Sequence, residues 1–285
     1  QAPHFAFAAL GRRSAGGRTL IDSELQREVD RLLRAHVHRL DAQAEIAAIL
    51  LEIESGAVVA MSGSTDFRNP VDGQVNGCLA PRSPGSTLKP FVYAAAIEQG
   101  RIAHDTVLKD LPASFAGWAP RNFDRTFSGE VTVEQALCRS LNLPALFLAR
   151  EIGLAQCLGV MEACGVRLPS SALGRGGLSL VLGGVESDLL SIANAYATLG
   201  RGGVRMKPRF FIDEEKEGVR VLQASTCAWL DHMLSSRRHP PKGRSAGEIS
   251  WFMRKTGTSS GKRDAWAVGH NGKYAAGIWV GRFSG

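Results

Sequence analysis

The spacing of apolar residues divides this chain into helical and strand-like blocks. Between residues 21 and 40, apolar positions recur every three or four residues with charges between them, which predicts an amphipathic helix. Ser23 and Gln26 have the spacing of a capping box at its start. Residues 1–18 are rich in Ala, Gly and Arg and show no clear period, so we expect a linker or arm there.

Short apolar runs near both ends have the composition of strands. Residues 44–53 and 57–61 are rich in Ile, Val, Leu and Ala, and Glu54-Ser55-Gly56 between them predicts the turn of a β-hairpin. Near the C-terminus, Asn271-Gly272 is a strong hairpin signal. Three strands are predicted around it, at residues 249–256, 265–269 and 274–280.

Helical spacing fills the middle of the chain, whereas residues 100–130 carry few regular signals because Pro and Gly recur through them. Strand runs separated from a helical run imply an α+β fold, most simply one antiparallel sheet built from both ends of the chain and covered by helices. We expect an N-terminal arm and linker helix over residues 1–43 and one domain over residues 44–285. Helices are predicted near residues 86–97, 131–137, 145–152, 155–164, 187–199 and 225–234.

Composition and charge narrow the choice of partners. The chain has 285 residues, of which 44% are hydrophobic and 21% charged, as in ordinary globular proteins. Its formal net charge of +7 suits an anionic partner such as nucleic acid, acidic lipid or an acidic cell-wall polymer. The basic residues are scattered, and the sequence has no zinc-finger spacing and no aromatic–basic RNA motif. A nucleic-acid partner is therefore not expected.

Other sequence signals are weak or absent. No apolar run approaches the roughly 20 residues that span a bilayer, and no signal peptide is visible. The chain begins at Gln1 rather than Met, so we expect it to be a piece of a longer protein with any export signal upstream. The five cysteines form no Cys-x-x-Cys pair, so we expect no metal or other cofactor and interpret most cysteines as small core residues.

Ser86 and Lys89 combine a potential nucleophile and a potential base at a helix start. Pro84 and Gly85 interrupt any preceding element, and Pro90 fits the first helical turn, where amides have no internal partner. Lys89 lies three residues after Ser86, hence on the same helical face. A neutral lysine could take the serine proton, which requires burial or a nearby positive charge to lower its pKa. Alone the pattern is weak, because an N-cap serine beside a solvated lysine looks the same.

Two further motifs strengthen this interpretation. Ser140-Leu141-Asn142 offers a hydroxyl and a carboxamide that can point into one cleft. Lys255-Thr256-Gly257-Thr258 ends a predicted strand and offers a cation, two hydroxyls and a glycine that a substrate backbone could approach closely. The combination of Ser-x-x-Lys, a Ser-x-Asn form of the second motif and Lys-Thr-Gly is typical of serine β-lactamases and penicillin-binding proteins.

Over nearly its whole length, the chain resembles the transpeptidase domain of the class A penicillin-binding proteins. The resemblance implies an α+β fold of the type shared by these transpeptidases and the serine β-lactamases, with residues 44–285 as the transpeptidase domain. It covers the segments Thr19–Leu40, Arg82–Gly100, Pro120–Asp124, Gly129–Ala145, Leu182–Gly203 and Lys255–Gly281.

The resemblance implies a D,D-transpeptidase that cross-links the stem peptides of peptidoglycan. Ser86 would attack the penultimate D-Ala of a D-Ala-D-Ala donor, with Lys89 as the base. Ser140 would pass a proton to the leaving D-Ala, and Asn142 would hold the substrate amide. An amine of a neighbouring stem peptide would then resolve the acyl-enzyme. β-Lactams would mimic D-Ala-D-Ala and leave Ser86 acylated.

The third motif is assigned to substrate binding by the same resemblance. Lys255, Thr256 and Thr258 would bind the terminal carboxylate with Gly257 beside them, and the backbone N–H groups of Ser86 and Thr258 would form the oxyanion hole. Class A members also carry a glycosyltransferase domain, a membrane anchor and a helix after the last strand, none of which is found in this sequence. The implied parent protein is periplasmic and tethered to the inner membrane.

Two alternatives share the same acylating residues. A penicillin-sensing or scaffold domain would be acylated without turning over a stem peptide. A serine β-lactamase would need an activated water to break the ester, often through a placed Glu. The sequence has no Glu-x-x-Leu-Asn segment between the second and third motifs, which disfavours the β-lactamase.

Overall fold

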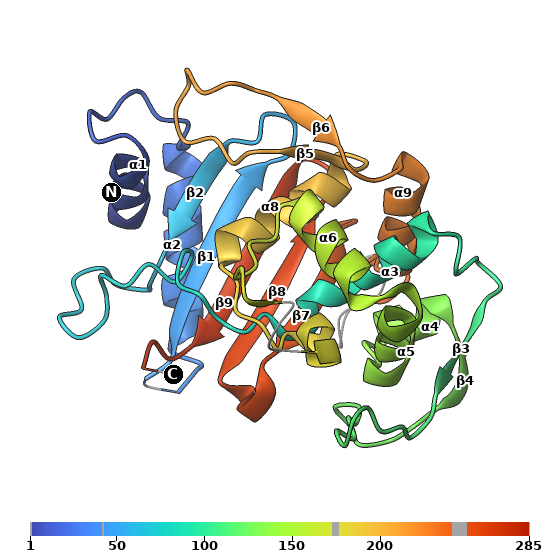
Figure 1. Cartoon of the computed structure of the whole chain (residues 1–285). Helices are drawn as coiled ribbons and strands as arrows, with labels where there is room; N and C mark the ends of the chain where they lie inside the picture. The colour runs from blue at the N-terminus through green and yellow to red at the C-terminus, as the bar shows by residue number, and fades with distance from the viewer. Residues whose placement is uncertain (1, 42, 173–176, 241–249, 285) are drawn as a thin grey trace.

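A five-stranded antiparallel sheet forms the centre of the computed structural model, which describes residues 2–41, 43–172, 177–240 and 250–284 (Figure 1). The strand order is β2-β1-β9-β8-β7, so strands from the two ends of the chain form one sheet. This confirms the predicted α+β fold. The strands are β1 (Glu45–Glu52), β2 (Val58–Ser62), β7 (Met253–Thr258), β8 (Asp264–His270) and β9 (Tyr274–Gly281).

The pairing of β1 with β9 joins the two ends of the chain. Glu45 lies opposite Gly281 and Glu52 opposite Tyr274, so the two strands pair along their whole length. β7 forms one edge of the sheet and pairs with β8 alone. The first of the three C-terminal strands was predicted to start at residue 249, which lies outside the described residues, and β7 begins at Met253.

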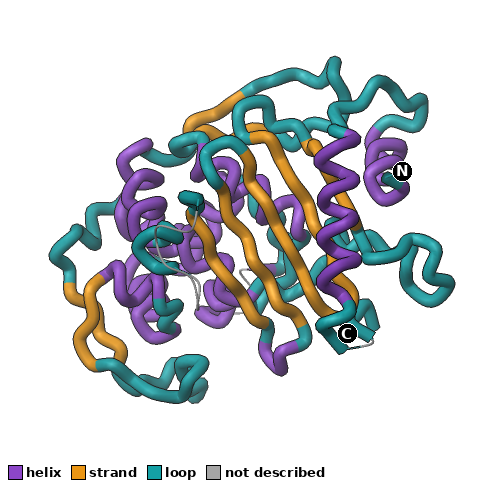
Figure 2. Tube along the Cα trace, turned by 180° about the vertical axis from the view of Figure 1, so that it is seen from behind, coloured by secondary structure: helices purple, strands orange, loops and turns teal. Residues whose placement is uncertain are grey.

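Helices cover both faces of the sheet. α8 packs across one face against β9, β1 and β8, while α2 (Ser23–Val37) packs on the other face against β1 and β2 (Figures 1 and 2). The helical layer on the α8 side lies between the sheet and the β3–β4 hairpin (Figure 1). It contains α3 (Lys89–Glu98), α4 (Val133–Cys138), α5 (Asn142–Ile152), α6 (Leu154–Cys164), α8 (Leu189–Gly200) and α9 (Ala224–Met233).

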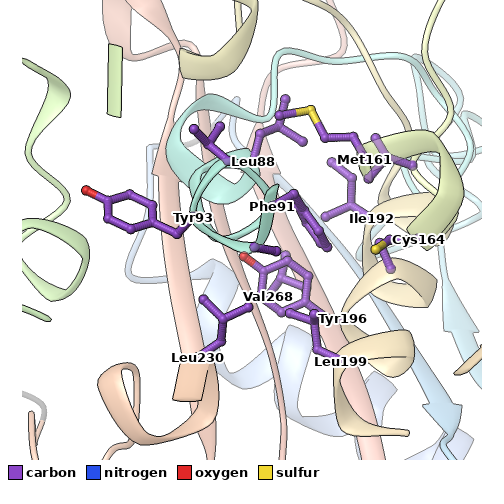
Figure 3. Packing of buried hydrophobic residues seen from close by; sticks show 14 of the residues in the cluster. Leu88, Phe91, Tyr93, Met161, Cys164, Ile192, Tyr196, Leu199, Leu230 and Val268 are labelled. Atoms are coloured by element: carbon purple, nitrogen blue, oxygen red, sulfur yellow. The ribbon is translucent and has the colours of Figure 1, made fainter. Parts of the chain in front are cut away.

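α3 runs through the middle of the core. Each residue from Lys89 to Ala96 is buried, because α5, α6 and α9 surround this helix. Phe91 meets Tyr196 of α8 edge to face, with ring centroids 5.6 Å apart, and Leu88 and Met161 pack beside them (Figure 3). This packing fixes the turn that precedes α3.

The cysteines lie mostly in the core, as predicted, and three tryptophans lie in or beside the sheet. All five cysteines are free, and each except the half-buried Cys138 is buried in the core. Trp266 and Trp279 are buried in the sheet, and the Trp279 indole donates a hydrogen bond to Asp264 (2.9 Å). Trp251 is half-buried and packs edge-on against His270.

The N-terminal segment is a correction to the sequence analysis. Residues 1–18 were expected to be an arm, but Pro3–Arg12 form helix α1. Phe5 is 2% exposed and stacks on Phe210 with centroids 5.1 Å apart. The local pattern could not reveal this helix, because its buried partner lies about two hundred residues away in the sequence.

The predicted capping box of α2 is also wrong. Asp22 is the N-cap, and its carboxylate accepts from the backbone N–H groups of Glu24 (2.8 Å) and Leu25 (3.0 Å). Gln26 instead reaches the sheet, where its carbonyl oxygen accepts from the backbone N–H of Met61 (2.8 Å). The side chain that matched the local motif is used for tertiary packing.

Four short strands and three 3-10 turns add to the predicted elements, and one of the turns, Gly85–Leu88, forms the start of the helix predicted from residue 86. The strands pair as two small hairpins, and each has only three or four residues, too few for a period to show. In the described part of the chain no single helix is long and apolar enough to cross a membrane. α5 and α6 together have sufficient length and apolar character, but they bend by 101° at their junction. The additional elements are β3 (Val107–Asp110), β4 (Gly129–Thr132), β5 (Val204–Met206), β6 (Gly218–Arg220), η1 (Gly85–Leu88), η2 (Gly177–Leu182) and η4 (Ser260–Lys262).

The docking of α1 can be tested by comparing its two phenylalanines. Phe5 is buried, whereas Phe7 is 65% exposed. Phe5→Ala should lower the free energy of unfolding by about 3 kcal/mol, because it leaves a cavity against Phe210. Phe7→Ala should cost less than about 1 kcal/mol. Urea unfolding measures both, and equal small losses would show that α1 is not docked.

Candidate active site

Ser86 lies on the 3-10 turn η1, which leads directly into α3. The turn has Gly85 with a φ of 55°, a left-handed conformation that glycine adopts readily. The Thr87 hydroxyl donates to the Pro84 carbonyl (3.0 Å), and the buried Tyr196 hydroxyl donates to the Thr87 carbonyl (2.8 Å). Ser86 is half-buried at a cleft, on a turn held from the core side by Tyr196.

Ser140 lies where α4 ends and the chain turns into α5. Its φ of 59° is strained for a residue with a side chain. The turn is closed by the backbone N–H of Leu141, which donates to the Ala136 carbonyl (2.9 Å). Asn142 follows as the first residue of α5. The strained turn brings Ser140 and Asn142 to the same side as Lys89.

Lys89 is fully buried and is hydrogen-bonded to the second motif. Its Nζ donates to the Ser140 carbonyl (2.5 Å) and to Asn142 Oδ1 (2.7 Å), with Ser140 Oγ at 3.3 Å. Burial, and then the charge of Lys255, lower the pKa of Lys89 well below its ordinary value, while Asp110 acts in the opposite direction. A neutral amine at this position has a lone pair that can accept a proton.

Lys255 approaches the same serine from the edge strand β7. Its Nζ donates to Ser140 Oγ (2.7 Å) and to the Thr256 carbonyl (3.0 Å). Burial lowers the pKa of Lys255 to about 7. The Ser140 hydroxyl therefore lies between two amines of depressed pKa and can exchange protons with either.

Three glycines allow the walls of the site to touch. A Cβ on Gly257 would lie 2.1 Å from the Pro84 carbonyl oxygen, and one on Gly85 would lie 2.7 Å from the backbone nitrogen of Thr258. A Cβ on Gly183 would lie 2.2 Å from the backbone nitrogen of Gly85. Because these backbones are in contact, the N–H groups of Ser86 and Thr258 belong to neighbouring segments of the cleft.

The structure brings all the residues of the three motifs together. The cleft has a volume of about 1120 Å³. The lysines lie behind its wall, where they are hydrogen-bonded to the second motif. The other motif residues line it: Ser86, Ser140, Asn142, Thr256, Gly257 and Thr258.

Several residues of the site were not predicted from the sequence. Tyr196 and Gly183 come from segments quoted only for the family resemblance, and their contacts with η1 depend on the fold. Arg121, Arg139 and Lys262 add positive charge to the cleft, and they too come from segments quoted only for the family resemblance. Asp110 was not predicted to be a site residue either, because a single Asp in a short strand gives no sequence pattern that indicates a function.

The fold, with its serine turn packed against an edge strand, is that of the serine acyltransferases that include the penicillin-binding proteins. Residues 46–283 match the family model described as the penicillin-binding protein transpeptidase domain. The chain therefore belongs to the family of penicillin-binding protein transpeptidase domains, and the family resemblance found in the sequence is confirmed.

Individual relatives agree with this assignment. Penicillin-binding protein 1C of Escherichia coli (strain K12), a class A member that the sequence as a whole resembles, is 35% identical across 100% of this chain and 37% of its own length. Penicillin-binding protein 1F of Bacillus subtilis (strain 168) is 30% identical across 93% of this chain and 40% of its own length. The chain thus spans about two fifths of these curated relatives.

Solved structures show the same fold. The penicillin-binding protein PonA1 from Mycobacterium tuberculosis matches 94% of this chain and 75% of its own chain, with a TM-score of 0.80 and 23% identity. The PonA1 protein in complex with penicillin V matches with the same TM-score, at 22% identity, over 94% of this chain and 77% of its own.

The close approach at Gly257 predicts a sharp difference between two glycines. Gly257→Ala should cost about 1–3 kcal/mol of unfolding free energy, because the added methyl meets the Pro84 carbonyl. Gly159→Ala in α6, where a Cβ meets nothing within 4 Å, should stabilise by about 0.5–1 kcal/mol. Urea unfolding of both variants tests the contact, and a neutral Gly257→Ala would contradict it.

Proposed function

We propose that this chain is a peptidoglycan D,D-transpeptidase domain that works through a Ser86 acyl-enzyme. The observation that carries the proposal is the pair of buried amines, Lys89 and Lys255, both within reach of the Ser140 hydroxyl beside the Ser86 cleft. Membership of the transpeptidase family supports the reaction class. The substrate is a stem peptide ending in D-Ala-D-Ala.

Acylation begins at Ser86. Neutral Lys89 takes the hydroxyl proton, and Ser86 Oγ bonds to the carbonyl carbon of the penultimate D-Ala. The backbone N–H groups of Ser86 and Thr258 stabilise the negative charge on the carbonyl oxygen in the transition state. The close packing of Gly85 against Thr258 supports this pairing, because it brings the two backbones to the same point of the cleft.

Departure of the terminal D-Ala needs a proton, which Ser140 delivers to the leaving nitrogen as the C–N bond breaks. Its hydroxyl recovers a proton from Lys89 or Lys255, the two amines that lie beside it. Asn142 holds the substrate amide. Lys255, Thr256 and Thr258 bind the terminal carboxylate, with Gly257 allowing the close approach.

The second half-reaction uses an amine from a neighbouring stem peptide. The amine attacks the ester carbon, and Ser86 leaves with its proton restored. The new amide bond cross-links the two stem peptides. A β-lactam enters the first step in place of D-Ala-D-Ala and leaves Ser86 acylated.

The whole parent protein belongs to the proposal as well. This chain spans about two fifths of the relatives named above. We propose that it works as part of a class A protein with a glycosyltransferase domain and a membrane anchor, located in the periplasm at the inner membrane.

The central experiment is covalent labelling by penicillin. After excess drug is mixed with the protein and removed, intact-mass spectrometry should show one added drug mass on Ser86 that persists for many minutes. Ser86→Ala should retain its thermal melt and gain no mass. Stable labelling of a folded Ser86→Ala variant would refute the assignment of the nucleophile.

The other outcomes separate the alternative functions. Rapid return to the unmodified mass with steady hydrolysis of the drug would indicate a β-lactamase. A stable adduct without turnover of a D-Ala-D-Ala stem peptide plus an acceptor amine, tested on the full-length protein, would indicate a penicillin-sensing or scaffold role.

The role of Lys89 as base makes a further prediction. Arginine keeps its proton at this position, so Lys89→Arg should slow acylation at least about 10²-fold, the scale of a lost general base. Stopped-flow labelling with a fluorescent penicillin measures the rate, and circular dichroism checks that the variant is folded. Near-normal acylation would mean that Lys89 is not the base.

A further inference from the structure

A buried carboxylate lies behind the second motif. Asp110, the last residue of β3, has 0% exposed surface. Its Oδ1 and Oδ2 accept from Asn122 Nδ2 at 2.8 and 3.0 Å, and its Oδ2 also accepts from the backbone N–H of Ser128 (2.8 Å). These bonds tie the loop between β3 and β4 to the strand that precedes it.

Asn122 extends this network to the active site. Its Oδ1 accepts from the backbone N–H of Asn142 (2.7 Å), while its Nδ2 donates to the Thr126 carbonyl (2.8 Å) as well as to Asp110. The Asn122 side chain is 5% exposed. Its hydrogen bonds join three segments: the end of β3, the loop at Thr126 and the start of α5.

The same loop sets the orientation of the Asn142 carboxamide. Asn142 Nδ2 donates to the Arg121 carbonyl (2.6 Å), and Asn142 Oδ1 accepts from Lys89 Nζ (2.7 Å). The contact with Arg121 therefore turns the amide so that its oxygen faces the lysine. The second hydrogen of Nδ2 stays available to the cleft, which Asn142 lines.

We infer that Asp110 and Asn122 are positioning residues for acylation, which act through Asn142 to hold Lys89 and the substrate amide in register. The network runs from Asp110 through Asn122 to the Asn142 backbone, and then through the Asn142 carboxamide to Lys89. The inference rests on the proposed function, because it concerns the rate of the Ser86 reaction.

The charge of Asp110 has a second consequence. A buried carboxylate is costly unless hydrogen bonds and opposite charge compensate it. Here the Asn122 amide, shared between both carboxylate oxygens, and the Ser128 N–H donate to it, and its charge opposes the effect of burial and Lys255 on the pKa of Lys89. Asp110 therefore makes the pKa of Lys89 fall less than it otherwise would, in addition to holding Asn122.

The primary test compares two asparagines that are both buried. Asn122→Ala should lower the acylation rate constant for a fluorescent penicillin about 10²-fold, the scale expected when a reacting group shifts by about 1 Å. Asn194→Ala in α8, 3% exposed and bonded to the Met206 carbonyl, should lower the melting temperature and leave acylation unchanged. An unchanged rate in folded Asn122→Ala would overturn the inference.

A double-mutant cycle distinguishes positioning from general destabilisation. In an Asn142→Ala background, Asn122→Ala should cost much less than it does in the native chain, because the carboxamide that it orients is gone. Equal costs in both backgrounds would show that Asn122 has only a structural role. Asp110→Asn, which keeps an acceptor for Ser128 and Asn122, should retain more activity than Asp110→Ala, and equal rates would contradict the proposed role of Asp110.

Labelling of the native chain separates the two proposals. If the native chain forms no penicillin adduct, the proposed function fails before the inference is tested. If it does form the adduct and Asn122→Ala forms it equally fast, only the inference fails.

Discussion

Two lysine amines are buried around the Ser140 hydroxyl, and the geometry of the active site is built on this arrangement. Lys89 and Lys255 come from a core helix and an edge strand, and both contact Ser140. An ammonium removed from water costs free energy, so burial lowers the pKa of both lysines, and the charge of Lys255 lowers the pKa of Lys89 further. The packing that holds them there lowers the pKa of Lys255 to about 7 and the pKa of Lys89 well below its ordinary value, so both amines can take part in proton transfer.

The fold maintains this arrangement with strain at a few points. Ser140 keeps a left-handed backbone, which costs about 1–2 kcal/mol for a residue with a side chain. α4 supports it with a capping box between Thr132 and Gln135 and with the bond from Leu141 to Ala136. Glycines at positions 85, 183 and 257 remove the side chains that would separate η1, η2 and β7. Rigid packing from outside the cleft therefore sets the geometry inside it.

Charge balance around the site is uneven. Four basic residues line the cleft with one carboxylate, Asp124, whereas Asp110 lies behind it at the end of a hydrogen-bonded network. A carboxylate at that depth compensates the lysines without presenting negative charge to an incoming substrate. The positive cleft is consistent with a substrate that carries a terminal carboxylate, as the proposed stem peptide does.

From the sequence alone we could predict the strands and helices with clear periods, the antiparallel sheet built from both ends of the chain, and the three motifs of the site. Those features depend on local spacing, which a single chain displays. Tertiary structure alone decided that Pro3–Arg12 would form a helix, that Gln26 would bond to β2 rather than cap α2, and that Asp110 would support Asn142. In each case the deciding partner is distant in sequence or reached through an intermediate residue, and distant contacts leave no local pattern.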